Sequence, residues 1–235
     1  MNISFSDTGF DWINPLINIV AVLMGSGLAW MASYFFEKKK QDQTDLATGY
    51  SLMFKVQEFA DEITQLEKAV GDSYSGAQAE GVEGPAWTKL NNIVGFNRIA
   101  NPVFSEELAL IARTKNHQLV MDVRELESGH RILKSVLHEI SSLKTNLEAM
   151  NLGRSVEGKV VTFGIGKAEF PSVAPTLIGL NELSEHLDKI LPRISEHARQ
   201  TATELGPFLK KSYKFSHFIS LSFSDGVEQT QVGSK

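Results

Sequence analysis

The longest apolar stretch of the chain lies near its N-terminus. No charged residue occurs between Asp11 and Glu37, and the most apolar part covers residues 16–36. As a helix, these roughly 21 residues would reach about 31 Å, close to the hydrocarbon thickness of a bilayer. The pattern predicts a transmembrane helix over residues 12–36, preceded by a short extracytoplasmic tail over residues 1–11.

Two other interpretations of this stretch are a buried helix of a soluble domain and a cleaved secretory signal. A secretory signal begins with basic residues, whereas the residues before this stretch carry only Asp7 and Asp11. The stretch is also long for a signal sequence. We therefore favour an uncleaved membrane anchor.

The basic residues predict the orientation of the anchor. Lys38, Lys39 and Lys40 directly follow the apolar stretch, and no Lys or Arg precedes it. Because basic residues stay on the cytoplasmic side, we expect a single-pass protein of the plasma (inner) membrane, with its N-terminus outside and its C-terminal domain in the cytoplasm. The three lysines would contact lipid headgroups.

One side of the expected membrane helix carries small or polar residues. They recur at intervals of three and four, so they share a face. They are Asn14, Asn18, Ala21, Gly25, Ala29, Ala32 and Ser33. Such a stripe permits close approach of a second helix, so we expect it to be a membrane-helix association face. Gly and Ala are also common in membrane helices in general, which is the simpler explanation.

Helical spacing of apolar residues continues beyond the lysines. It predicts a juxtamembrane helix over residues 37–70, with or without a break at 41–44. Four glycines then indicate a flexible loop over residues 71–85. A shorter helix is expected over 86–99, ended by Asn101 and Pro102.

The clearest helical pattern follows Ser105, a suitable N-cap before two glutamates. Apolar residues alternate in steps of four and three, which predicts one long helix over residues 105–150 with a heptad seam. The seam comprises Leu119, Val123, Leu126, His130, Leu133, Leu137, Ile140 and Leu147. It must pack on other helices of this chain or on a second copy. His130 at a core position would fix the register or act as a pH-sensitive switch.

The C-terminal third is more broken. Residues 159–165 are rich in β-branched side chains and predict a short strand. A helix is expected from Pro175 to a break or kink at Pro192, continuing to Gly206. Residues 217–223 fit a strand that would pair with 159–165, or a further helix turn. Residues 225–235 are polar and predicted to be a disordered tail.

These elements predict a mainly α fold. A single N-terminal transmembrane helix would be followed by a cytoplasmic helical bundle domain over residues 86–224, with a long heptad-patterned helix and room for one small β-hairpin.

Composition narrows the chemistry. The 235 residues contain no cysteine, which excludes disulfides, cysteine-ligated metals and thiol nucleophiles. The net charge is −5, and residues 1–40 sum to zero, so the acidic excess belongs to the remaining body. This balance gives no indication of nucleic-acid binding.

Histidines are the main candidates for catalysis or metal binding. Glu127 and His130 have the Glu-x-x-His spacing of dimetal bundles, but the nearest second pair, Glu182 and His186, is spaced by four. We find no catalytic constellation and predict no cofactor and no metal. Near the C-terminus, Lys210 and Lys211 alternate with aromatic residues, as in a membrane-surface helix or a core helix with a basic edge.

The sequence therefore favours a non-enzymatic, membrane-anchored module that oligomerises or docks a partner. Its expected partners are membrane lipid and either a second copy of the chain or another membrane or cytoplasmic protein. Two alternatives are a membrane-perturbing or channel-forming effector that uses the transmembrane helix, and a metal-dependent bundle enzyme.

Overall fold

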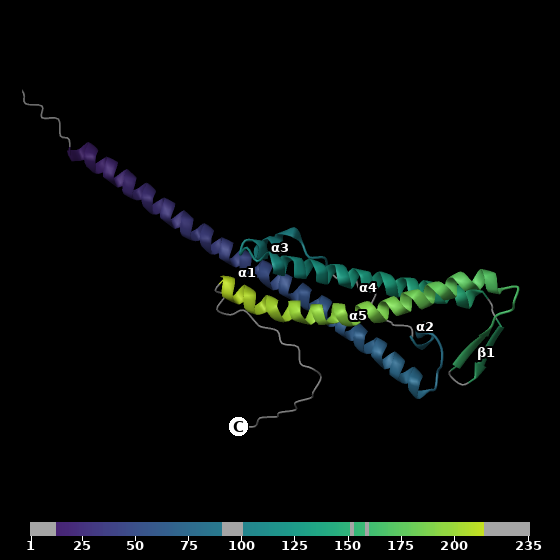
Figure 1. The fold of residues 1–235 in the computed structure, drawn as a ribbon. Helices are drawn as coiled ribbons and strands as arrows, with labels where there is room; N and C mark the ends of the chain where they lie inside the picture. The colour runs from purple at the N-terminus through teal and green to yellow at the C-terminus, as the bar shows by residue number, and fades with distance from the viewer. Residues whose placement is uncertain (1–12, 91–100, 151–152, 158–159, 214–235) are drawn as a thin grey trace, which may run out of the picture. The chain divides into compact units, whose positions relative to one another are not determined.

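The computed structural model describes residues 13–90, 101–150, 153–157 and 160–213. The chain divides into two compact units, Met1–Ala47 and Thr48–Lys235. The elements are α1 (Ile13–Ala79), α2 (Ala86–Lys89), α3 (Ser105–Ala112), α4 (His117–Ala149), β1 (Gly153–Glu157), β2 (Val160–Gly164) and α5 (Phe170–Tyr213). The described chain is thus mainly helical, with one long apolar helix near the N-terminus (Figure 1).

The first unit is the N-terminal part of α1. This helix continues through residues 41–44, so the break that the sequence left open is absent from this described segment. Gln41 Nε2 donates to Asp45 Oδ1 at 2.8 Å, and Thr44 Oγ1 donates to the Lys40 carbonyl at 3.0 Å. Each contact joins residues one helical turn apart, and both stabilise the helix in the polar stretch that follows the lysines.

The second unit is a bundle of α4, α5 and the part of α1 that follows Thr48 (Figure 1). α1 and α4 run in the same direction, and α5 runs against both. Two contacts give the α1–α5 register: Tyr74 meets Asp188, and Glu67 meets Ser195. Because two parallel neighbours need a connection that returns along the bundle, the chain between α1 and α4 is long and contains α2 and α3.

The core of the bundle is formed mainly by leucine, isoleucine and valine side chains of the three long helices. Leu52 and Ile63 of α1, Leu126 and Leu133 of α4, and Leu205 of α5 are all fully buried. Burial of one such side chain contributes about 1.5–3 kcal/mol, so α1 is a full member of the bundle. The expected bundle domain of residues 86–224 therefore began too late, because residues 48–79 belong to it.

The expected loop over residues 71–85 is also wrong in its first half, because α1 continues to Ala79. Ser73 is buried and donates to the Ala69 carbonyl, and the Tyr74 hydroxyl donates to Asp188 Oδ1 at 2.7 Å. These contacts outweigh the helix-weakening effect of Gly71 and Gly76, which costs about 1 kcal/mol per glycine. The turn is confined to the residues that follow, where Gly81 and Gly84 have positive φ angles.

The single helix expected over residues 105–150 is two helices, α3 and α4. Lys115 between them has a φ of 61°, which no helix interior accommodates. The Asn116 side chain then accepts from the Leu119 N–H at 3.2 Å and caps α4. The heptad spacing continued across this turn because apolar residues on both sides face the same core.

The expected cap at Ser105 is replaced by a different contact. Phe104 precedes α3, and its N–H donates to Glu107 Oε2 at 2.7 Å. The carboxylate therefore caps the helix from inside its first turn, as in the second half of a capping box.

α5 is longer than expected at both ends, and it contains three prolines that the sequence treated as helix starts or breaks. Each proline deprives the carbonyl four residues earlier of its hydrogen bond. All three prolines are exposed, and so are the residues that own those carbonyls. At exposed positions, water can replace the lost helical hydrogen bond. The carbonyls that lose their helical hydrogen bond belong to Pro171 (from Pro175), Asp188 (from Pro192) and Thr203 (from Pro207).

β1 and β2 form an antiparallel pair in which Gly153 lies opposite Gly164 and Glu157 opposite Val160. The sequence allowed residues 217–223 either as a strand partner of 159–165 or as part of a helix. Residues 217–223 lie outside the described residues. The expected helix over 86–99 is described only as α2, and Leu90 after it is extended and buried.

Candidate functional site

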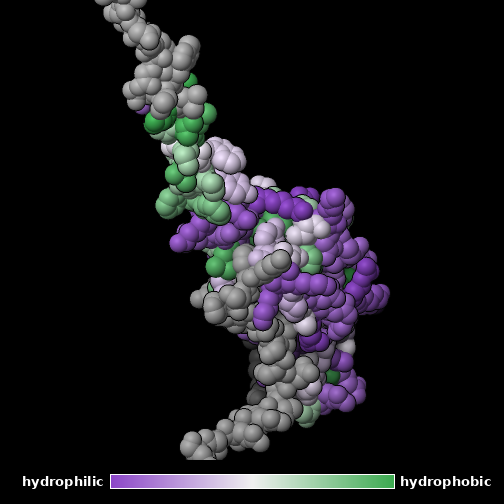
Figure 2. Space-filling view, turned by 90° about the vertical axis from the view of Figure 1, so that its left-hand side faces the viewer, coloured by the Kyte–Doolittle hydropathy of each residue, from purple (hydrophilic) through white to green (hydrophobic). Residues whose placement is uncertain are grey.

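The apolar part of α1 is the most unusual surface of the described chain. α1 is long and apolar enough to cross a membrane. Side chains over residues 17–44 are all exposed, including Trp30 at 71 % and Phe36 at 75 %. Figure 2 shows this concentration of hydrophobic side chains, in contrast to the mostly hydrophilic surface of the bundle. A helix segment that exposes this many large apolar side chains is poorly solvated by water.

The residues of the predicted association face lie in this segment. Asn18, Ala21, Gly25, Ala29, Ala32 and Ser33 are exposed, and Asn14 belongs to α1 through its backbone. A Cβ atom added at Gly25 would have no neighbour within 4 Å in the described chain. The face is therefore sterically open.

A feature that the sequence interpretation missed lies on the other side of α1. The rings of Trp30 and Tyr34 stack with centroids 6.1 Å apart. Tyr34 follows Gly25 by nine residues, or about 2.5 turns, which places it opposite the small residues. The four-residue spacing of the two aromatics was visible in the sequence. The helix thus has one small-residue face and one bulky aromatic face.

The three lysines that follow this segment, Lys38, Lys39 and Lys40, are exposed on α1. Their side chains are free to reach a charged surface.

The heptad seam is placed in the interior of the bundle. All of its residues are buried except Leu137, which is half-buried beside the buried Val136. The cover comes from within the chain: Gly129 of α4 lies against Ile194 of α5, and His130 lies against Phe59 of α1. The seam therefore presents little free surface for a second copy.

His130 joins α4 to α1. Its Nε2 atom lies 2.7 Å from Glu62 Oε2, and the two side chains are 6 % and 16 % exposed. The imidazole ring is 5.0 Å from the Phe59 ring. A polar pair with a single geometry among mostly apolar core side chains fixes how two helices align.

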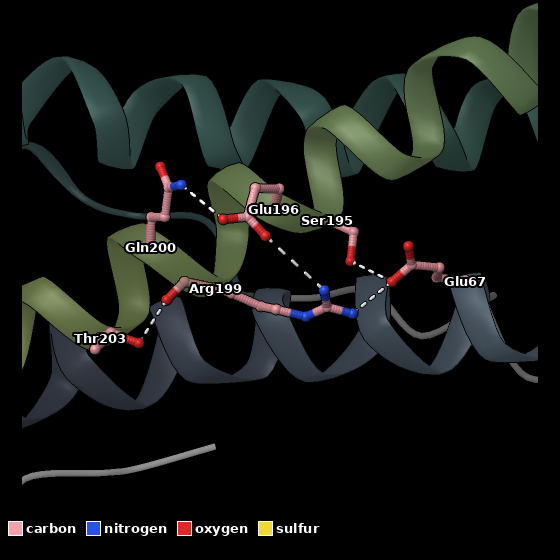
Figure 3. A network of polar contacts seen from close by, with 6 residues as sticks. All are labelled: Glu67, Ser195, Glu196, Arg199, Gln200 and Thr203. Carbon is pink, nitrogen blue, oxygen red and sulfur yellow. Dashed lines mark hydrogen bonds and ion pairs between the residues drawn. The ribbon is translucent and has the colours of Figure 1, made fainter. Parts of the chain in front are cut away.

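Glu67 joins α1 to α5 (Figure 3). Its Oε2 atom accepts from Ser195 Oγ at 2.7 Å and from Arg199 Nη2 at 2.5 Å. Arg199 also lies 4.0 Å from Glu196, which accepts from Gln200 on the same helix. Arg199 and Glu67 are about one-third exposed, so solvent weakens the ion pair and its main effect is on helix register.

Glu107 joins α3 to α1. It accepts from Ser51 Oγ at 2.6 Å and from Lys55 Nζ at 2.8 Å, and its side chain is 5 % exposed. Burial raises the pKa of this carboxyl group, but the hydrogen bonds from Lys55, Ser51 and the Phe104 N–H outweigh burial and hold the pKa below its usual value.

Two further polar contacts lie towards the other end of the bundle. Burial and the hydrogen bond to Asp188 raise the pKa of the Tyr74 hydroxyl. Lys144 donates to the Leu90 carbonyl, and burial lowers the pKa of its amine although Glu148 opposes the shift. The first contact joins α1 to α5, and the second joins α4 to the residue that follows α2.

The candidate metal residues are not brought together. His130 faces Glu62, and Glu127 lies 3.6 Å from Arg131 on the surface of α4. Glu182 and His186 are exposed on α5. Across the described ranges, no three His, Asp or Glu side chains form a cluster that could hold a metal ion.

The described chain is thus an α-helical bundle whose first helix extends into an exposed apolar segment. No protein-family model, no curated protein and no solved structure matches it.

Proposed function

We propose that this chain is a single-pass membrane protein whose anchor helix also associates with a second copy, holding the helical bundle as a non-enzymatic docking domain. One observation carries the anchoring: the apolar side chains of α1 over residues 17–36 are exposed. Water would solvate some twenty such residues at a cost of roughly 25 cal/mol per Å² of apolar surface, and a bilayer removes that cost.

The lysines support an orientation with the bundle in the cytoplasm at the plasma (inner) membrane. Lys38, Lys39 and Lys40 are exposed directly after the apolar segment. Translocating them is unfavourable, whereas the anionic cytoplasmic leaflet attracts each by about 1 kcal/mol.

The two faces of α1 support self-association through the anchor. Helices in lipid gain little from burying apolar surface against each other, so close backbone contact decides which face pairs. The Gly25 face allows such contact, and the opposite face with Trp30 and Tyr34 suits lipid. The buried heptad seam shifts the expected association surface from the bundle to the anchor.

The test combines vesicle flotation with the mass of the protein in detergent. We expect the full chain to float with vesicles and to form an oligomer in sedimentation equilibrium. Gly25→Ile together with Ala29→Ile should shift it to monomer. Gly27→Ile is the matched control, because Gly27 is equally open but lies on the aromatic side.

Two results would contradict the proposal. If the full chain does not float with the vesicles, the proposed membrane anchoring is wrong. An oligomer that survives in a chain beginning at Gln41 would place association in the bundle and not in the membrane helix.

A further inference from the structure

The fold gathers three distant segments at the end of the bundle where α1 enters from Ala47. We call this end the basic tip and define it as residues 48–55 of α1, residues 101–116, and residues 205–213 of α5. Lys55 Nζ donates to the Pro102 carbonyl at 2.9 Å, which joins the first two segments. The Tyr213 hydroxyl donates to the Leu110 carbonyl at 2.5 Å, which joins the second and third.

Charge at the tip differs from that of the whole body. Its basic residues are Lys55, Arg113, Lys115, Lys210 and Lys211, and its acidic residues are Glu106 and Glu107. Lys55 and Glu107 pair with each other, which leaves a basic excess. The next acidic residues of α1 and α5 on the bundle side of the tip are Glu58 and Glu204. Five basic and two acidic residues give the tip a charge of +3, whereas residues 41–235 as a whole sum to −5.

Two exposed aromatic side chains accompany these charges. Phe54 and Phe104 are each 57 % exposed. Lys55 Nζ lies 3.9 Å from the centroid of the Phe104 ring, and the Phe54 ring stacks on Tyr50 at 6.4 Å. Exposed phenylalanines favour the interfacial region of a bilayer, and exposed lysines elsewhere on the tip favour its anionic headgroups.

We propose that the basic tip binds the anionic phospholipid surface of the membrane that holds the anchor. This inference rests on the anchoring proposed above. Lysines beside an anionic leaflet gain electrostatic energy, and the acidic remainder of the bundle is repelled, so the tip faces the membrane. Only residues 37–47 separate the apolar segment from the bundle, so even when fully extended they keep the tip within about 40 Å. This tether gives the tip a high effective concentration at the surface.

The absence of native cysteine allows one fluorophore to be placed at will in the full-length protein. Ser212→Cys labels the tip, and Ser142→Cys on α4 is the control, since both serines are exposed. Energy transfer to a headgroup-labelled lipid would be measured in phosphatidylcholine vesicles with and without phosphatidylglycerol.

We expect energy transfer from Ser212→Cys to rise with phosphatidylglycerol and to fall with added salt, while transfer from Ser142→Cys stays constant. Lys210→Glu with Lys211→Glu should lower the ratio of bound to free tip by at least fivefold per lysine, for about 1 kcal/mol each. Lys189→Glu with Arg193→Glu is the control on the same helix, as these residues are exposed away from the tip.

Failure of the two proposals is distinguishable. A protein that does not float with vesicles contradicts the anchor itself. A protein that floats but shows no effect of phosphatidylglycerol at Ser212→Cys contradicts the lipid-binding tip. Transfer that depends on protein density and not on anionic lipid would assign the tip to a second copy, and also overturns the inference.

Discussion

At the scale of single residues, α1 is held by a short series of polar contacts. Glu107 reaches it from α3, His130 from α4, and Ser195 and Arg199 from α5. Each contact places a donor or acceptor where apolar packing alone would permit sliding. A buried polar group that loses its partner costs about 1–3 kcal/mol, so each contact penalises other registers.

Glu107 gives the first prediction. Its folded-state pKa is lowered, so its contribution is present above the pKa of the unfolded chain and is lost as pH falls through the folded-state pKa. Glu107→Gln should lower the free energy of unfolding by about 2 kcal/mol at neutral pH and less at acidic pH. Urea unfolding between neutral and acidic pH measures this. Glu106→Gln, an exposed neighbour, should change little, and an equal loss at every pH would refute the linkage.

The pair of His130 and Glu62 gives the second prediction. His130→Leu should destabilise the bundle by roughly 1–3 kcal/mol, because the mostly buried Glu62 carboxylate loses this hydrogen bond. Adding Glu62→Leu should recover part of the loss, since the apolar pair leaves no unmatched charge. Thermal and urea unfolding of the two single variants and the double variant give a double-mutant cycle for the pair. A higher melting temperature for His130→Leu alone would show that the pair does not stabilise the fold.

At the scale of elements, helix ends are decided by contacts as much as by local sequence. α1 continues through Gly71 and Gly76, and α5 continues through Pro192 and Pro207, although each residue weakens a helix. α4 instead begins only at His117, because Lys115 adopts a positive φ and Asn116 caps the next turn. The sequence predicted a loop at the glycines, a break or kink at Pro192, an end near Pro207 and a continuous helix across Lys115. In the structure, helix continues through the first four sites and is interrupted at Lys115.

Two glycines test this element-scale argument. Gly71→Ala should stabilise the protein by about 0.5–1 kcal/mol, because Gly71 is helical, exposed and sterically open within the described chain. Gly129→Ala should instead cost about 1 kcal/mol or more, because its Cβ would lie 2.9 Å from Ile194 Cγ2. The free energies of unfolding of both variants, measured by chemical denaturation, test these two expectations. Absence of any gain for Gly71→Ala would indicate that residues 71–79 form the loop expected from the sequence.

At the scale of the whole molecule, the two units differ in the apolar surface that they expose. The apolar segment of α1 is exposed, whereas the buried apolar side chains of the described residues lie between Leu52 and Leu209. The core of the bundle therefore includes no side chain from the apolar segment.

A chain beginning at Gln41 should accordingly fold by itself. We expect it to be a soluble monomer with the near-ultraviolet circular dichroism of a packed core, and to unfold within about 1 kcal/mol of the full chain in detergent. Sedimentation equilibrium and urea unfolding measure both properties. Aggregation, or loss of the near-ultraviolet signal, would show that the anchor contributes to the core.

Local pattern was sufficient for the features that depend on neighbours in the chain. A run of uncharged apolar residues is long enough for a membrane span in any fold, and steps of three and four place Leu119 through Leu147 on one helix face. The mainly helical class and the long apolar helix followed from these periods. Periodicity could not decide whether the seam packs against other helices of this chain or against a second copy.

Tertiary structure decided what depends on residues far apart in the chain. It placed the seam against α1 and α5, brought Glu62 to His130 and Glu67 to Arg199, and gathered Lys55, Lys115 and Lys211 at one end. Hydrophobic periodicity reports how much surface a helix must bury but carries no information about which helix covers it. Direction and register come from a few buried polar contacts and from steric limits such as Gly129 against Ile194, and these exist only once the helices have met.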